Sequence, residues 1–422
     1  MHRSNKIMVV FAVNAMYSFR NISSSNCIRH IASLAGLIIL TGCLSPITLN
    51  KTVLAYNRSI SEINAQELLL NIARVRHHHP IQFTTVSSIA ATFNFQMSAG
   101  ATPPFGALTS GQGLSPIFGG SISENPTISI TPISGEEFNQ RILNPFSENK
   151  FLKLYQQGTD LGLLIRMMAS EIRIKHDGID QVLRNRPREQ DSYEEFRRKI
   201  MHLTALNQAN QLQVEPVIVQ QDVTMHGITT EHSETLVNAL EMGYRWIEKG
   251  NTGVLSRKVS GRTIISNYDI SSLSVEERNK LFLYTNTLPE NEIFVDIRPG
   301  LPGGDYPIQG IIRLRAFLAI LGFLGRGVSE EIEFHVDKDS RTGEIRHDPI
   351  KTLEVDIRSS NLVDNTSTFA VAYKGRTYSI LDGDSPEAVW NLEAFRLLGQ
   401  LYELSIHPSE FARPAPAITI AK

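Results

Sequence analysis

The chain has 422 residues, enough for two or three domains of ordinary size, each with its own hydrophobic core. Hydrophobic residues make up 41% of the sequence and charged residues 20%, a balance that excludes a largely disordered protein. The net charge of −2 includes no basic surplus, so nucleic acid is not expected as a partner.

The N-terminal region has the composition of a secretory signal. The first 43 residues contain four Lys or Arg residues and no Asp or Glu. Residues 31–40 form an apolar run, which is too short to span a membrane because a helical span needs about 20 residues. Two arginines precede the run, as at the positively charged start of a signal peptide. Residues 1–42 are therefore predicted to be a signal peptide that starts at Met1 or Met16.

The apolar run ends in Leu40-Thr41-Gly42-Cys43, which resembles the lipobox of bacterial lipoproteins. The resemblance implies that the signal peptidase recognises Leu40, Thr41 and Gly42, and that Cys43 becomes the acylated N-terminus. Two or three acyl chains, such as palmitate, hold a folded domain stably at a membrane. Leu44 follows the cysteine where some lipoproteins have aspartate, which implies the periplasmic face of the outer membrane. The alternatives are an uncleaved signal anchor and a chance cysteine after an apolar run.

A tether and a helix are predicted next. Segment 43–60 shows no strong periodicity and is predicted to be the tether. In residues 61–76 apolar residues recur at spacings of three and four, which predicts a helix with Ser61 as its N-cap. Three consecutive histidines, His77–His79, follow this helix. They could bind a metal, but three adjacent side chains do not converge on a regular element, and histidine interacts favourably with a helix C-terminus.

The most unusual segment, residues 77–123, contains no Asp, Glu, Lys or Arg. Its first part alternates and is rich in Thr, Val, Phe and Ile, a loop of Gly, Ser and Pro follows, and residues 125–134 alternate again. The pattern predicts a long, uncharged β-hairpin. It is either an internal sheet with a flexible loop, or a subunit interface or membrane-contacting hairpin with Phe105 and Phe118 as contact residues.

The rest of the chain mixes helices with strands irregularly, which favours an α+β fold with antiparallel hairpins. We expect a helical region with the long hairpin over residues 61–215 and an α+β domain over 216–422. Helices are predicted at 159–174, 233–249, 274–284 and 308–325 and from Pro386 onward with Ser385 as N-cap. Ser274 and Glu277 match a capping box at the start of the helix 274–284, and Ser134 is predicted as the N-cap of a further helix. Strands are predicted at 211–225, 253–266, 291–299, 331–338, 344–359 and 368–381, with turns at Ser260-Gly261 and Lys374-Gly375.

The C-terminal third carries a second resemblance. It contains the sequences AVAYKGRTYSI and NLEAFRLLGQLYEL and ends with RPAPAITI, and this pattern resembles proteobacterial proteins of unassigned activity. The resemblance implies no reaction and no functional residues.

Motifs for catalysis or cofactor binding are weak. Segment 337–348 faintly resembles a calcium-binding loop, but Arg341 occupies a ligand position, and a hairpin turn is the favoured interpretation. Carboxylates such as Asp296 and Glu354 do not stand out from ordinary surface acids. Both cysteines lie in the N-terminal region, which argues against thiol catalysis. We therefore expect no metal and no cofactor.

The sequence thus predicts a lipid-anchored protein of the cell envelope with a structural or assembly role and no enzymatic activity. Its partners would be the membrane, through the lipid on Cys43, and either further copies of itself or another envelope protein. The alternative is a lipid-anchored enzyme or small-ligand-binding protein whose site is built from residues far apart in the sequence.

Overall fold

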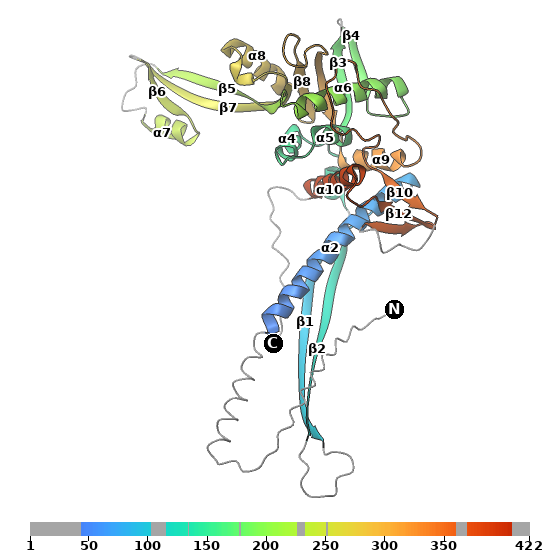
Figure 1. Ribbon diagram of the computed structural model, residues 1–422. Coiled ribbons are helices and arrows are strands. Elements are labelled where there is room, and N and C mark those ends of the chain that lie inside the picture. Colours follow the sequence, from blue (N-terminus) through green and yellow to red (C-terminus); the bar gives the residue numbers. More distant parts are fainter. Residues whose placement is uncertain are drawn as a thin grey trace, which may run out of the picture. The chain divides into compact units, whose positions relative to one another are not determined.

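The computed structural model describes residues 44–102, 115–133, 135–176, 179–225, 233–249, 252–359 and 369–406 (Figure 1). The chain divides into two compact units. The described part of the first unit contains residues 44–63 and 82–133, apart from the gap. The described part of the second contains Asn64–Ile81 and the residues from 135 to 406, apart from the gaps. The fold is α+β, as predicted.

The first unit contains a long two-stranded antiparallel ribbon. Strand β1 (Phe83–Thr102) pairs with β2 (Ser115–Ile133) along their whole length, from Phe83 opposite Ile133 to Thr102 opposite Ser115. A β-bulge between Val86 and Ser88 is the one shift in this register. At about 3.3 Å per residue, the 20 residues of β1 extend about 66 Å. The predicted long hairpin is confirmed, with Glu124 in β2 as the one charged residue of its two strands.

Helix α2 (Leu44–Arg76) is longer than the sequence pattern predicts. It runs for 33 residues through the segment expected to be a tether, so Ser61 lies inside the helix instead of capping it. Pro46 is compatible with this start because it lies in the first turn, where its missing N–H has no helical partner. The periodic part is buried in the second unit by Leu68, Leu69, Ile72 and Ala73.

A seven-stranded sheet forms the centre of the second unit, with the order β4-β3-β9-β8-β7-β5 and β6 paired to β7. Its pairs are antiparallel except β7 with β8. Residue 215, where the sequence suggested a domain boundary, lies inside β5. The strands are β3 (Ala169–His176), β4 (Ile179–Arg184), β5 (Gln213–Met225), β6 (Arg245–Lys249), β7 (Thr252–Ser266), β8 (Glu292–Ile297) and β9 (Ile308–Leu314).

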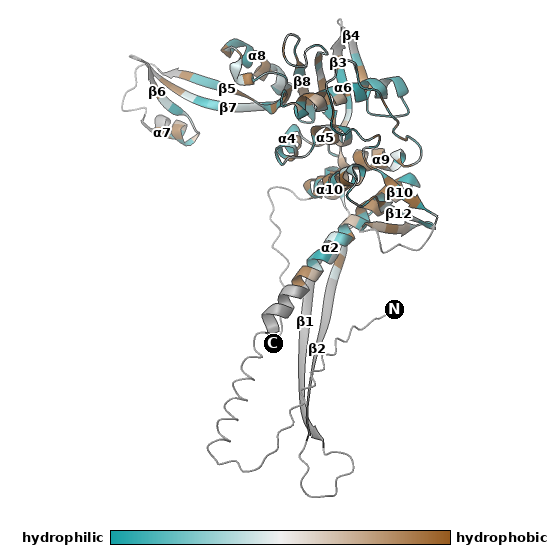
Figure 2. Cartoon of the chain, viewed as in Figure 1, coloured by the Kyte–Doolittle hydropathy of each residue, from teal (hydrophilic) through white to brown (hydrophobic). Residues whose placement is uncertain are grey.

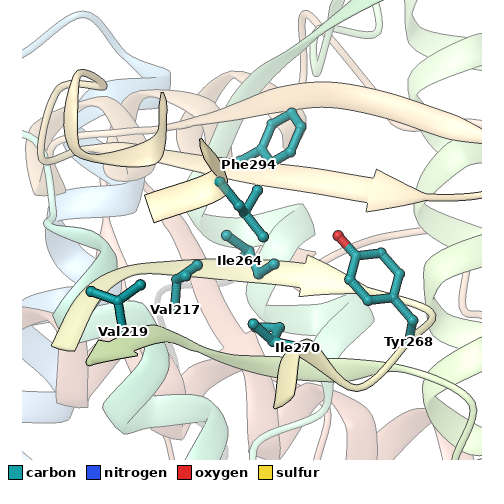
Figure 3. Close-up of a cluster of buried hydrophobic side chains, with 7 residues drawn as sticks. Val217, Val219, Ile264, Tyr268, Ile270 and Phe294 are labelled. Carbon is teal, nitrogen blue, oxygen red and sulfur yellow. The ribbon is translucent and has the colours of Figure 1, made fainter. Parts of the chain in front are cut away.

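Several helices pack on this sheet. Contacts join α4 (Glu148–Gln156) to β7, α5 (Leu161–Met168) to β3, and α6 (Gln190–Gln208) to β4. Helix α8 (Val275–Asn286) covers β5 and β7. A hydrophobic cluster under α8 joins the helix to the sheet (Figure 3), and it consists of Val217, Val219, Ile264, Tyr268, Ile270, Leu281 and Phe294.

The C-terminal elements form a second, smaller layer. The three-stranded sheet β10-β12-β11 turns at Lys374-Gly375, both in the left-handed region, as the sequence predicts. Helix α9 is mainly hydrophobic (Figure 2). The remaining elements are α3 (Glu136–Leu143), α7 (Ser233–Glu241), η3 (Ile270–Ser272), α9 (Phe317–Gly327), β10 (Val355–Arg358), β11 (Ala370–Tyr373), β12 (Arg376–Ile380) and α10 (Pro386–Ile406).

Some local predictions are confirmed. Ser274 and Glu277 form the predicted capping box at the start of α8. The Ser385 side chain accepts a hydrogen bond from Ala388 N at the start of α10. At α3, however, Gly135 and not Ser134 is the N-cap, and its helix has no side-chain cap.

Other local predictions are wrong. The apolar run 308–325 is strand β9 followed by α9, because Ile308–Leu314 alternates between buried and more exposed positions with a period of two. The predicted turn at Ser260-Gly261 is absent, since β7 continues through it and pairs with β5 on both sides of a bulge. Segment 233–249 is α7 followed by β6. The predicted strand 331–338 is absent, and of the predicted strand 344–359 only Val355–Arg358 forms, as β10, so residues 331–354 form no strand.

This strandless segment is held by buried charges. Glu333 accepts hydrogen bonds from Thr352 N at 2.5 Å and Tyr193 Oη at 3.0 Å, and it lies 3.4 Å from Arg166 Nη2. Arg197 Nη2 donates to Asp348 Oδ1 at 2.9 Å. Side chains of α5 and α6 thus attach this segment to the second unit, and it has no sheet hydrogen bonds.

Candidate functional site

The predicted lipidation site lies outside the described residues. This applies to Leu40, Thr41, Gly42 and Cys43, and also to the predicted contact residue Phe105. The second predicted contact residue, Phe118, lies in β2 opposite Ala99. The ribbon and a cleft in the second unit are therefore the two regions where a function can be argued from geometry.

The ribbon has two unpaired edges. Within the described residues β1 and β2 pair only with each other, so each strand presents a row of backbone N–H and C=O groups on its outer side. Between Arg76 and Glu136 the only charged residue is Glu124. Charged side chains usually protect such an edge from pairing with another chain. The ribbon therefore has edges of the kind that can pair with a strand from another chain.

The two edges of the ribbon are not equivalent. Strand β1 contains no proline and no charged residue. Strand β2 contains Glu124 and three prolines, Pro116, Pro126 and Pro132. Proline lacks the N–H that a ladder hydrogen bond needs and is typical of strand edges that stay unpaired. The outer edge of β1 is consequently the better acceptor of an added strand.

A cleft of about 500 Å³ lies in the second unit beside α8. Residues of β3, β8 and β9 form one side, and one face of α8 forms the other. Apolar side chains line its middle, among them Phe294, Tyr284 and Ile311, with the rings of Phe294 and Tyr284 edge to face at 5.1 Å. Arg173, Arg298 and Lys280 contribute positive charge. Asp296 and Glu277 also line the cleft, so it is an apolar groove bordered by three cations and two carboxylates.

One end of the cleft contains a buried carboxylate with two donors. Asp296 Oδ2 accepts hydrogen bonds from Tyr268 Oη at 2.6 Å and from Arg298 Nε at 2.8 Å. The guanidinium of Arg298 also lies over the Tyr268 ring, 4.2 Å from its centroid. Burial, with the hydrogen bond to Asp296, raises the pKa of Tyr268, so this hydroxyl stays protonated and donating. The triad fixes the position of Arg298.

The other end of the cleft lies beside a row of alternating charges. Glu171, Arg313 and Glu292 are opposite one another on β3, β9 and β8. Arg313 lies 3.2 Å from Glu171 and 3.1 Å from Glu292, and Arg173 also contacts Glu292. The Nε atom of Arg173 is nevertheless buried without a hydrogen-bond partner, and the nearest Glu171 oxygen is 4.0 Å away. A residue that lines the cleft therefore carries an unsatisfied donor.

This arrangement suits binding better than acid–base catalysis. Asp296 is occupied by two donors, and Glu277 is held in the capping box with Ser274. A general base must be free to reach a proton of the substrate. The groups that remain for a ligand are arginine N–H donors and aromatic surface.

The histidine segment ends α2 and does not gather around one point. Each ring has a different partner, and among the described residues no group of three or more His, Cys, Asp or Glu could hold a metal ion. The contacts are His77 Nε2 with Tyr378 Oη (2.9 Å), His78 Nε2 with Glu330 Oε1 (3.0 Å), and His79 with the Tyr373 hydroxyl.

The acids of segment 337–348 likewise have cationic partners. Asp339 accepts from Arg341 at 2.7 and 2.8 Å, and Asp348 pairs with Arg197. Their oxygens do not converge, because Asp348 points to α6 while Asp339 closes a local turn. The expected hairpin is also absent here, because no strand flanks this turn.

Sequence reasoning missed the cleft. Of its lining residues only Asp296 stood out beforehand, as one carboxylate among many. The signal that existed was the alternation of Gln309, Ile311 and Arg313 in β9, which marks a half-exposed sheet face.

Comparisons with protein families, curated proteins and solved structures found no match. In the part of the chain that the structure describes, none of the helices combines the length and apolarity needed to cross a bilayer.

Proposed function

We propose that this chain is a lipid-anchored protein of the cell envelope that assembles with further copies of itself through the β1–β2 ribbon. The observation that carries the proposal is the ribbon, with strands of 20 and 19 residues, one charged residue and two edges unpaired within the described part. An isolated two-stranded hairpin is marginally stable in water. Addition of a strand at the β1 edge would supply the hydrogen bonds and buried surface that the ribbon alone lacks.

The register supports an assembly with two different faces. At alternate paired positions the residues are mainly apolar on both strands, with Phe93 opposite Glu124 as the one charged exception: Ile89 with Ile128, Ala91 with Pro126, Phe95 with Ile122, and Ala99 with Phe118. The intervening pairs are mainly small or polar: Ala90 with Thr127, Thr92 with Asn125, Asn94 with Ser123, and Gln96 with Ser121. Because strand positions alternate between faces, ribbons joined edge to edge would form an apolar surface and an uncharged polar surface.

The anchor belongs to the same proposal. Acylation at Cys43 would place the lipid directly before α2, which begins at Leu44 and is about 50 Å long at 1.5 Å per residue. A helix of that length is a stiffer connection than the flexible tether expected from the sequence. Multiple copies held at one membrane would also raise the local concentration of ribbons and favour their pairing.

The mass of the intact chain in detergent tests the assembly. We expect an oligomer by native mass spectrometry, and a monomer after the ribbon is shortened by joining Asn94 to Ser123 through Asn-Gly. These residues are paired in the register, and Asn-Gly is the preferred two-residue hairpin turn, so the shortened ribbon keeps its alignment. An intact chain that is monomeric, or a shortened chain with unchanged mass, contradicts the assembly role.

A pair of lysine variants provides a matched control. Phe95→Lys introduces a charge into β1, and Val223→Lys introduces the same charge at an exposed position of β5 in the second unit. We expect only Phe95→Lys to dissociate the oligomer, because charge prevents edge-to-edge pairing and apolar contact. If both variants dissociate the oligomer equally, the dissociation results from general destabilisation of the chain and the ribbon is not the interface.

Replacement of Cys43 tests the anchor separately. Cys43→Ala should abolish incorporation of an alkyne-labelled palmitate and release the chain from membranes. The neighbouring cysteine provides the control, since Cys27→Ala should change neither result. Continued membrane retention of Cys43→Ala contradicts the anchor without bearing on ribbon assembly in detergent.

A further inference from the structure

The cleft beside α8 has a composition that selects one class of ligand. Its volume of about 500 Å³ lies in the usual range for small-molecule sites, roughly 300–1,000 Å³. Its surface combines apolar and aromatic side chains with arginine N–H donors, and Arg173 lies directly across the sheet from Ile311. Phe294 is buried below the cleft, whereas Tyr284 is 42% exposed and forms part of the wall. A ligand with an apolar body would replace water over this surface.

Two arginines carry donors that the protein leaves without acceptors. Arg173 Nε is buried and unsatisfied, as described above. Arg298 uses Nε for Asp296, and within the described residues its terminal nitrogens have no hydrogen-bond acceptor. Fixed guanidinium groups prefer carboxylate and related planar oxyanions, because two parallel N–H groups match two oxygens. Each arginine already has one carboxylate partner, Glu292 for Arg173 and Asp296 for Arg298, so an incoming oxyanion would accept only the donors that remain.

We infer that this cleft binds an amphipathic organic anion, that is, a carboxylate or similar oxyanion carried on a flat apolar body. The apolar body would lie between Tyr284 and Ile311, and the anionic group would accept hydrogen bonds from Arg173 or Arg298. This binding activity goes beyond the assembly role and does not depend on the ribbon, since all lining residues belong to the second unit.

Isothermal titration calorimetry with 2-naphthoate tests the inference, and 2-naphthalenemethanol is the neutral probe of similar shape. The parent chain should bind the naphthoate at least about 10-fold more tightly than the alcohol, as expected for one charge-assisted hydrogen bond. Absence of saturable naphthoate binding at millimolar concentration, or equal affinity for both probes, overturns the inference.

Four variants test where the ligand binds: Arg173→Gln, Arg298→Gln, Tyr284→Ala and Arg358→Gln. Arg173→Gln should weaken naphthoate binding about 10-fold and leave the alcohol unaffected, and it removes no sole partner, because Glu292 keeps Arg313. Tyr284→Ala should weaken both probes, since it removes apolar surface. Arg358→Gln, at an exposed arginine of β10 remote in sequence from the cleft, should change neither affinity. If Arg173→Gln, Arg298→Gln and Tyr284→Ala all bind like the parent, the site is elsewhere and the inference is wrong.

Two further measurements keep failure of folding and failure of assembly apart from failure of binding. Arg298→Lys keeps the charge but loses the planar fork, so its circular dichroism should match the parent while its naphthoate affinity falls. The ribbon shortened at Asn94 and Ser123 should bind naphthoate with unchanged affinity. A loss of binding in that shortened chain would contradict a site contained within the second unit.

Discussion

Glu333 is the residue whose replacement we expect to destabilise the second unit most. Its side chain is only 6% exposed and lies between two guanidinium groups, with Arg166 Nη2 at 3.4 Å and Arg197 Nη1 at 3.8 Å. Both arginines are themselves buried. Glu333→Gln keeps the shape and an acceptor for Tyr193 but removes the negative charge.

The expected loss of unfolding free energy depends on which partners Arg166 and Arg197 retain in Glu333→Gln. Arg166 still donates to Pro349 O at 2.7 Å and Ile350 O at 2.8 Å, and Asp348 remains beside both arginines, but Asp348 is 29% exposed. Loss of one partner from a buried ion pair costs about 3–5 kcal/mol of unfolding free energy, because a charge is left uncompensated. With Asp348 retained, we expect the lower end, about 3 kcal/mol, for Glu333→Gln.

Tryptophan fluorescence during urea unfolding is a suitable assay. The chain has two tryptophans, and Trp246→Phe leaves Trp390, which donates to Thr352 O at 3.1 Å beside this network. The unfolding midpoint should fall while the slope stays constant. Glu330→Gln, three residues away at an exposed acid, should shift the free energy of unfolding by less than about 0.5 kcal/mol. A Glu333→Gln effect below about 1 kcal/mol would refute the reasoning.

The same pair predicts a pH dependence with a definite sign. Burial alone would raise the pKa of Glu333, but attraction to Arg166 and then Arg197 holds that pKa below its usual value. A lowered folded-state pKa means that the ionised carboxylate stabilises the fold above the unfolded-state pKa of about 4.3. This contribution is lost as pH falls through the folded-state pKa. The difference between parent and Glu333→Gln should therefore be constant near neutrality and shrink below about pH 4.

Three further substitutions or measurements test local features. Gly325→Leu should lower the unfolding free energy of the second unit by about 1–3 kcal/mol, because a Cβ there would lie 2.5 Å from Val75. Gly327→Leu is the control and should lower it less, because a Cβ there meets no atom within 4 Å. Ser274→Ala removes the capping box of α8 and should lower the unfolding free energy by about 1 kcal/mol, measured by the same urea titration. Burial lowers the pKa of Lys199 to about 8, so acetic anhydride at pH 8 should acetylate Lys199 ahead of exposed lysines, as read by peptide mass spectrometry.

The sequence predicted those elements that depend on neighbouring residues, such as the ribbon and the start of α8. The ribbon follows from alternation and from the near absence of charge. The start of α8 follows from Ser274 and Glu277, which are three positions apart and form one capping box. The run 308–325 misled the prediction because its overall apolarity outweighed its period of two. The buried face of β9 and the helix α9 are equally apolar, and only the positions of Gln309, Ile311 and Arg313 distinguish the strand.

Long-range contacts explain the remaining failures. Alternation between residues 331 and 354 predicts strands, but Glu333 and Asp348 bind arginines more than 130 residues earlier in the chain. The cleft escaped prediction for the same reason, since Arg173 and Arg298 come from elements separated by more than 100 residues. No local pattern signals that two arginines will flank one apolar surface.

The two units treat charge in opposite ways, and this contrast is the best argument for where the partner binds. The second unit places arginines and carboxylates inside its core and pairs them there, so its stability comes from contacts within the described chain. The ribbon has one charged residue and no third strand among the described residues. A strand pair about 66 Å long with that composition is only marginally stable in water as an isolated hairpin. In the proposed assembly, a neighbouring ribbon would supply both the edge hydrogen bonds and the apolar contacts that stabilise it.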